Sequence, residues 1–138
     1  MKFNITYDTQ IFSWQKFGGI SRIYKELINE FTKDPNINIR LSGRYHINEY
    51  LRESNIDKLN KLAYIPIMSK FPGKMNQIMN RKYFFNYLQN IKCDIYHETY
   101  YDSFSCSIPK KASRIITVYD MIDEKLASKT VNSPLGSK

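Results

Sequence analysis

Alternation of apolar and polar residues marks the strands that we expect in this chain. Residues 3–7 and residues 37–41 alternate in this way, and the run 115–119 is the most strand-like of the sequence. Residues 94–97 form a shorter strand of the same kind. These segments are the expected strands of one sheet.

Two other segments carry apolar residues at intervals of three and four positions, which predicts amphipathic helices. The first begins after Gly19 and ends before Asp34-Pro35-Asn36, because proline cannot continue a helix and Asn and Asp favour turns. The second runs from Lys74 to about Ile91. The apolar positions are Ile20, Ile23, Tyr24, Leu27, Ile28 and Phe31 in the first helix, and Met75, Ile78, Met79, Phe85, Leu88 and Ile91 in the second.

The connecting segments are less regular. The segment after Asp8 is expected to be a loop that ends in Phe17-Gly18-Gly19. The stretch 43–72 is polar with scattered apolar positions, and we expect one or two short helices between positions 45 and 62. Proline at positions 66 and 72 breaks the part that follows.

The order strand, helix, strand, helix, strand, strand indicates an α/β fold with an open, mostly parallel sheet and helices on both faces. A chain of 138 residues fits one such domain. We place this domain at residues 1–126, and we expect residues 127–138 to be a tail that is disordered or truncated.

The positive charge of the chain lies mostly in its middle. The formal net charge is +8, and residues 53–92 carry 7 basic and 2 acidic side chains, while residues 93–138 carry 6 of each. Such an excess suits phosphates on a charged substrate, on an anionic membrane surface or on nucleic acid. The alternative is a composition rich in lysine and asparagine that serves no specific partner. Because no motif of a nucleic-acid reader is present, we do not expect a nucleic-acid partner.

The sequence also bears on the cellular compartment. No apolar run approaches the roughly 20 residues that cross a bilayer, and no apolar signal core follows the N-terminus. Cys93 and Cys106 show neither metal-ligand nor redox-motif spacing. We therefore expect a cytoplasmic protein with reduced thiols, peripheral to a membrane if its basic region meets lipid.

Polar groups follow three of the expected strands. Asp8 and the Gly18-Gly19 loop follow the first, His97-Glu98 ends the third, and Asp120 follows the fourth. Ligands of open parallel sheets bind at the carboxyl ends of the strands, so these groups are the candidate site. Asp120, Asp123 and Glu124 show no ordered ligand spacing, and we expect no metal there.

The Gly18-Gly19 pair stands before the N-terminus of a helix, where exposed N–H groups attract phosphate oxygens and glycine allows close approach. The alternative is a plain turn, since neither a dinucleotide fingerprint nor a Walker loop is present. Ser21 either caps this helix or touches a ligand. Arg22 either reaches the ligand of the loop or remains in solvent.

His97 is one of two histidines in the chain. A histidine at a strand end suits hydrogen bonding to a sugar hydroxyl or proton transfer, and Glu98 beside it is a further candidate. The alternative is a structural histidine.

Residues 17–22, 94–98 and 117–124 together resemble the N-terminal domain of retaining family-four glycosyltransferases. The resemblance covers about residues 1–126. It implies one half of a GT-B fold, which consists of two Rossmann-like domains. In that family the N-terminal domain mainly binds the acceptor, and the C-terminal domain binds the sugar nucleotide.

The resemblance also implies roles for single residues. Gly18 and Gly19 match the loop that closes over the donor diphosphate. His97 matches a histidine near the transferred sugar that is important for activity, and Glu98 matches a neighbouring acidic position. Asp120 matches the aspartate of a Thr-Val-His-Asp type motif.

The sequence departs from the family at several points. Tyr119 stands where the family often has histidine, and Asp123 where it often has proline. The pair of glutamates, separated by seven residues, that holds the nucleotide in the second domain is absent.

The expectation is therefore the acceptor-side domain of a retaining glycosyltransferase. The nucleotide sugar is its donor, the acceptor is a glycan or a lipid-linked molecule, and no metal cofactor is required. This chain alone is expected to be inactive without a donor domain. The alternative is a non-catalytic binding or assembly module that associates with itself, with a separate donor domain or with an anionic surface.

Overall fold

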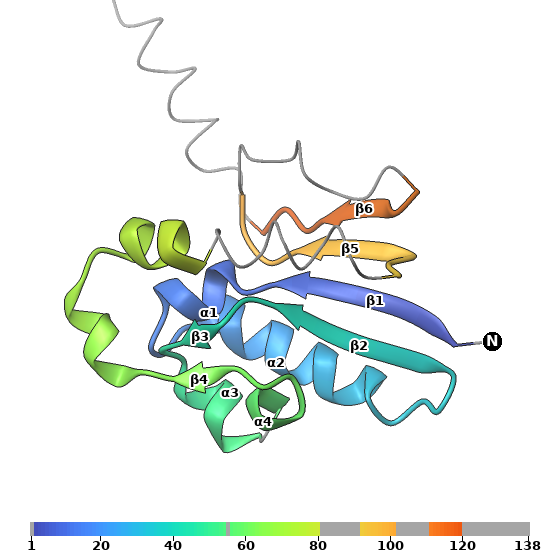
Figure 1. The fold of residues 1–138 in the computed structure, drawn as a ribbon, viewed down its shortest axis with the longest axis horizontal. Coiled ribbons are helices and arrows are strands. Elements are labelled where there is room, and N and C mark those ends of the chain that lie inside the picture. Colours follow the sequence, from blue (N-terminus) through green and yellow to red (C-terminus); the bar gives the residue numbers. More distant parts are fainter. Residues whose placement is uncertain (1, 55, 81–91, 102–110, 120–138) are drawn as a thin grey trace, which may run out of the picture.

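The computed structural model of this chain describes residues 2–54, 56–80, 92–101 and 111–119. Its centre is a four-stranded sheet in the order β2-β1-β5-β6, and every neighbouring pair is parallel (Figure 1). The α/β fold and the open parallel sheet predicted from the sequence are thus confirmed. The strands are β1 (Phe3–Asp8), β2 (Ile37–Ser42), β5 (Ile95–Glu98) and β6 (Ser113–Ile116).

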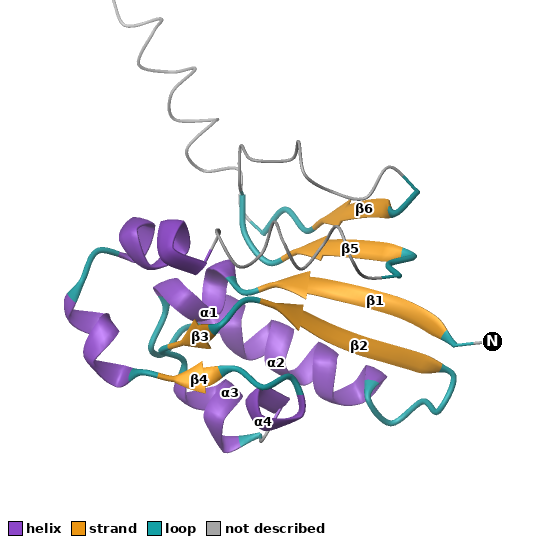
Figure 2. Ribbon diagram, viewed as in Figure 1, coloured by secondary structure: helices purple, strands orange, loops and turns teal. Residues whose placement is uncertain are grey.

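Helices flank this sheet (Figure 2). The long helix α2 (Gly19–Phe31) carries the chain from the carboxyl end of β1 back towards the start of β2, as the spacing of apolar residues predicted. The segment expected to be a loop after Asp8 instead contains a short helix, α1 (Gln10–Trp14). Its first backbone N–H groups find acceptors in the side chains of Asp8 and Thr99, which the local sequence does not signal.

A small lobe follows β2. It contains the predicted short helices as α3 (Glu49–Glu53) and α4 (Ile56–Leu59), followed by the 3-10 helix η1 (Pro66–Lys70). The lobe also contains a second sheet in which β3 (Tyr45–His46) pairs in parallel with β4 (Ala63–Tyr64). This sheet was missed because a two-residue strand is too short to show alternation.

The main core lies between the sheet, α2 and the small lobe. In α2, Tyr24 and Ile28 are buried, whereas Ile23 of the predicted apolar stripe is exposed. Both faces of β1 are covered, since each residue from Asn4 to Asp8 is buried. The buried apolar cluster consists of Ile5, Tyr7, Ile11, Phe12, Tyr24, Ile28, Leu41, Leu51, Ile56 and Leu62.

Two predicted elements differ from the structure. The strand expected at 115–119 ends at Ile116, because its partner β5 ends at Glu98, which pairs with Ile116 and leaves residues 117–119 without a ladder. The helix expected from Lys74 to Ile91 is described over residues 73–80, and its remaining positions lie outside the described residues.

Several other sequence predictions also fall outside the described residues. These positions are Cys106, Asp120, Asp123, Glu124 and the tail 127–138. Within the described part of the chain, no helix has the length and apolar character to cross a bilayer.

Candidate functional site

The carboxyl ends of β1 and β5 bring three candidate side chains to one edge of the sheet. Tyr7 pairs with His97, so Asp8 and Glu98 follow side by side at the ends of their strands. Because side chains alternate across a strand, His97 lies on the face of Tyr7, and Asp8 and Glu98 belong to the opposite face. The edge therefore holds two separate groups of polar side chains.

His97 lies in an aromatic cluster beneath α2. Its ring stacks on Tyr7 with centroids 5.1 Å apart and meets Tyr24 edge-on at 5.4 Å. Its Nε2 lies 3.1 Å from the hydroxyl of Thr117. Burial lowers the pKa of His97 because it disfavours the charged imidazolium. The ring is thus fixed and favours the neutral form, with 9% of the residue exposed.

Tyr24 ties α2 to the end of β5. Its hydroxyl donates to the carbonyl oxygen of Glu98 at 2.7 Å, and its ring meets Tyr119 edge-on. The aromatic cluster therefore fixes the height of α2 above the strand that carries His97.

Glu98 is held by a bidentate ion pair. Arg114 of β6 approaches both of its carboxylate oxygens at 2.7 Å, and the Glu98 side chain is buried. Such a fork-shaped pair fixes geometry and compensates the buried charge. In this arrangement Glu98 joins β5 to β6 and is already neutralised by a partner.

The carboxyl group of Asp8 has a strongly shifted pKa. Its Oδ1 accepts hydrogen bonds from the backbone N–H and the hydroxyl of Thr99 and, at 3.2 Å, from the N–H of Gln10. Burial raises its pKa to about 7, the hydrogen bonds oppose this, and the charge of Glu98 adds to it. A carboxyl group with such a pKa exchanges protons near neutral pH. The sequence placed Asp8 at this edge but did not indicate its burial.

The two glycines of the loop differ in their surroundings. A Cβ atom at Gly18 would lie 2.1 Å from Oε1 of Gln15, whereas a Cβ atom at Gly19 would meet nothing within 4 Å. Gly18 therefore allows the Gln15 side chain to fold against the loop, and Gly19 leaves its backbone open at the first residue of α2.

The other two candidates near the loop have different settings. Ser21 is buried, and its hydroxyl donates to the carbonyl oxygen of Gly18 at 3.0 Å. The side chain of Gln15 accepts from the N–H of Ser21, so both residues support the loop. Arg22 is exposed on α2, one turn from the open backbone of Gly19.

Asn48 of the small lobe holds the segment that precedes Gly18. Its Nδ2 donates to the carbonyl oxygen of Gln15 at 2.7 Å, and its Oδ1 accepts from the N–H of Leu51 as the cap of α3. The N–H of Glu49 donates to the carbonyl oxygen of Lys16 at 3.0 Å. The segment before the glycines is therefore attached to α3 by two adjacent residues, which no sequence motif indicated.

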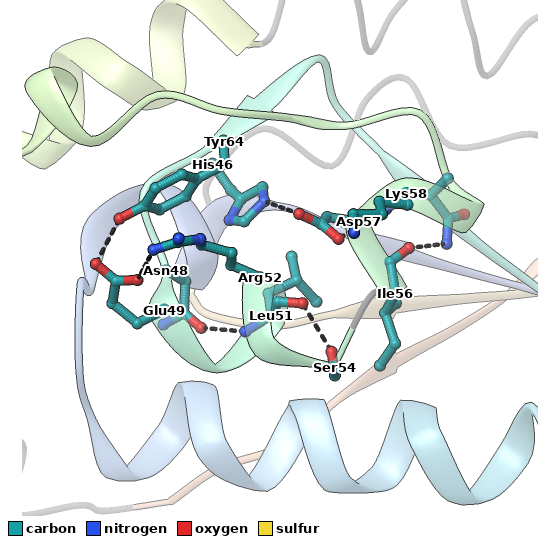
Figure 3. A network of polar contacts seen from close by, with 11 residues as sticks. His46, Asn48, Glu49, Leu51, Arg52, Ser54, Ile56, Asp57, Lys58 and Tyr64 are labelled. Atoms are coloured by element: carbon teal, nitrogen blue, oxygen red, sulfur yellow. Dashed lines mark hydrogen bonds and ion pairs between the residues drawn. The ribbon is translucent and has the colours of Figure 1, made fainter.

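Asn48 belongs to a larger polar network of the small lobe (Figure 3). Nε2 of the fully buried His46 lies 3.3 Å from a carboxylate oxygen of Asp57. The hydroxyl of Tyr64 donates to Glu49, which also pairs with Arg52. Burial lowers the pKa of His46, and the hydrogen bond from Tyr64 is the main cause that lowers the pKa of Glu49.

No local pattern in the sequence indicates this network. His46 and Asp57 lie on different elements and form no recognisable motif, so only the closure of the lobe brings them together. Among the described residues, no group of three or more His, Cys, Asp or Glu side chains is placed to hold a metal ion.

Comparison of the chain with protein-family models, with curated proteins and with solved structures finds no match.

Replacing Asn48 by Asp is expected to loosen the glycine loop while keeping α3 capped. The new carboxylate still accepts from Leu51, but it cannot donate to Gln15 and repels its carbonyl oxygen. Hydrogen exchange of the Phe17 to Ile20 amides should accelerate by roughly tenfold, the equivalent of one lost hydrogen bond. Exchange of the α3 amides should change little, and equal acceleration in both segments would contradict the assignment.

Proposed function

We propose that this chain is the acceptor-side domain of a retaining glycosyltransferase that uses a nucleotide sugar as donor. The donor domain in this proposal is a further segment or a separate chain. The sequence resemblance of residues 17–22 and 94–98 motivates the proposal. Its structural support is that both segments reach the carboxyl edge of one parallel sheet, where ligands of such sheets bind.

The observation that carries the proposal is the open backbone at Gly19. The residue begins a helix of 13 residues, it has free space on the side where a Cβ atom would stand, and Gln15 and Asn48 hold the preceding loop. The N-terminus of a helix favours a diphosphate through its N–H groups and its positive dipole end. Arg22 adds an exposed positive charge one turn along the helix.

In this scheme the loop stabilises the charge that develops on the leaving diphosphate, which is electrostatic catalysis by preorganised donors. The sugar is transferred with retention at its anomeric carbon, and no step requires a metal. His97 is 9% exposed and fixed by Tyr7, Tyr24 and Thr117. Its burial favours a positioning role, in which the aromatic cluster sets the height of α2, over direct contact with the sugar.

The Gly19→Asp variant is expected to bind pyrophosphate more weakly without a loss of stability. A carboxylate at the start of α2 interacts favourably with the helix dipole, so stability should stay level or rise by about 0.3–1 kcal/mol. The same charge repels a diphosphate, so affinity for inorganic pyrophosphate should fall by roughly tenfold or more. Titration of the chain followed by NMR signals of the Gly19 and Ile20 amides measures the binding, and urea unfolding measures the stability.

The matched control is Gly19→Asn, which has the same size without the charge. It should retain most of the affinity for pyrophosphate. Pyrophosphate that leaves the Gly19 amide unshifted, or binds the aspartate variant as well as the original chain, would remove the main support for the proposal.

A second candidate function is a non-catalytic module that pairs with a separate donor domain. The edge strand β6 and the residues after it favour this alternative, because Ile115, Ile116 and Val118 are all exposed. Edge strands with exposed apolar residues are prone to pair with another chain. A complex of this chain with a donor domain that neither hydrolyses nor transfers any sugar nucleotide would favour the module over the enzyme.

A further inference from the structure

The helix at residues 73–80 presents apolar side chains to solvent and polar ones to the protein. Ile78, for example, is 55% exposed. Surface helices of globular proteins normally show the reverse pattern, with the apolar stripe against the core. The exposed side chains are Lys74, Met75, Ile78 and Met79, and the buried ones are Asn76 and Asn80.

Hydrogen bonds attach this helix to its neighbours. Nδ2 of Asn76 donates to the carbonyl oxygens of Ser13, at 3.3 Å, and Met68, at 2.9 Å. The hydroxyl of Tyr45 donates to the carbonyl oxygen of Asn76 at 3.0 Å. The helix is therefore docked through its polar face, and its apolar side chains are exposed to solvent.

The 3-10 helix η1 extends the same surface. The carbonyl oxygen of Met68 accepts from Asn76, which places η1 beside the start of the helix, and Ile67 is 60% exposed. Both segments lie beyond the carboxyl ends of the strands, at the left of Figure 1. We call this surface the apolar rim, and it consists of Ile67, Phe71, Met75, Ile78 and Met79.

The charged side chains in the segment that carries the apolar rim are all basic. Lys70 and Lys74 are exposed within it. Residues 60–93, which include the whole rim, contain six basic side chains and no acidic one. A surface that combines exposed Ile, Met and Phe side chains with lysines suits the boundary between the headgroups and the acyl chains of an anionic bilayer. Lysine stems can lie along apolar surface there while the ammonium groups meet lipid phosphates.

We propose that the apolar rim, with Lys70 and Lys74, docks this protein onto an anionic lipid bilayer. The carboxyl edge of the sheet then faces the membrane surface. This proposal does not depend on glycosyl transfer, because binding to lipid is measured without a sugar nucleotide.

The chain contains its own reporter for this contact. Trp14 is the single tryptophan, it is partly exposed, and a Cβ atom at Gly73 would lie 2.9 Å from its ring. It therefore stands at the base of the helix that begins at residue 73. Vesicles of phosphatidylcholine and phosphatidylglycerol in equal parts should shift its fluorescence to shorter wavelength and co-sediment with the protein. Pure phosphatidylcholine vesicles should do neither.

Two double variants test the two parts of the surface. Replacing Lys70 and Lys74 by Gln should weaken binding to the anionic vesicles by roughly 25-fold, since each lysine near such a surface contributes about fivefold. Replacing Ile78 and Met79 by Gln should weaken it by roughly tenfold or more through lost apolar burial. All four side chains are exposed, so the fold should survive these changes.

The helix α4 offers matched controls in Lys58 and Leu59, which are also exposed. Lys58→Gln and Leu59→Gln should leave vesicle binding within about twofold, although they change charge and apolarity in the same way. Equal losses in rim and control variants would overturn the proposal, as would equal binding to neutral and anionic vesicles. The chain could instead fail to bind vesicles and form concentration-dependent dimers that the Ile78 and Met79 double variant abolishes. That result would assign the rim to contact with a second copy of the chain.

Discussion

Between pH 4 and 7, the free energy of unfolding of the Asp8→Asn variant is expected to lose the pH dependence that Asp8 causes in the original chain. In the original chain the pKa of Asp8 rises from 3.8 to about 7 on folding. Within that window the unfolded chain releases a proton that the folded chain keeps, so stability falls as the pH rises. The difference amounts to up to about 4 kcal/mol above pH 7.

Asparagine removes this cost because it cannot ionise and still accepts the hydrogen bonds from Thr99 and Gln10. The variant should therefore be more stable than the original chain above pH 7 and similar to it near pH 4. Urea unfolding at a series of pH values measures this, and comparing the two chains at each pH cancels the contributions of His46 and His97.

Asp94 provides a control with the opposite sign. Its carboxylate accepts hydrogen bonds from the backbone and the side chain of Asn4, which lower its pKa. Asp94→Asn should therefore weaken the fold at neutral pH and not in acid. If Asp8→Asn also weakens the fold at neutral pH, the carboxyl group of Asp8 is ionised and stabilising, contrary to our account.

Replacing Asn80 by Leu is expected to destabilise the fold by about 3–5 kcal/mol, although it makes a buried position apolar. Asn80 donates to the hydroxyl of Ser13 at 2.8 Å and to the carbonyl oxygen of Tyr45 at 2.9 Å. It also accepts from the N–H groups of Arg44 and Tyr45. Each buried group that loses its partner costs about 1–3 kcal/mol, which exceeds the gain from a buried leucine side chain.

The contrasting variant is Ile78→Gln on the exposed side of the same helix. It should change the free energy of unfolding by no more than about 0.5 kcal/mol, because the side chain is in solvent. Urea unfolding compares both variants with the original chain. Equal stability of Asn80→Leu and the original chain would mean that the helix does not dock through its polar face.

The sequence was sufficient for the main sheet because its strands and first helix carry strong local periodicity. Residues 3–7 and 37–41 alternate, and the helix that begins at Gly19 has a clear stripe and a proline stop, so these elements appeared with boundaries correct to about two residues. The end of β6 was misplaced because the length of a strand depends on its partner, and β5 ends at Glu98.

The helix at residues 73–80 shows the limit of periodicity. Spacing identified the helix, but it could not tell which side faces the protein. Asn76 and Asn80 find hydrogen-bond partners on α1, β3 and η1, and these partners decided the orientation against the apolar stripe. Such partners are distant in the chain, so no local pattern contains them.

By itself, the sequence determined the parallel α/β fold, the glycine loop before a helix, and the meeting of Asp8, His97 and Glu98 at one sheet edge. Only the tertiary structure decided what each of these groups faces. It placed His97 between two tyrosines, paired Glu98 with Arg114, buried Asp8 and left Gly19 open. The reason is physical: the positions of strands and helices along the chain follow from local patterns, whereas burial and hydrogen-bond partners depend on residues that come together only when the chain closes.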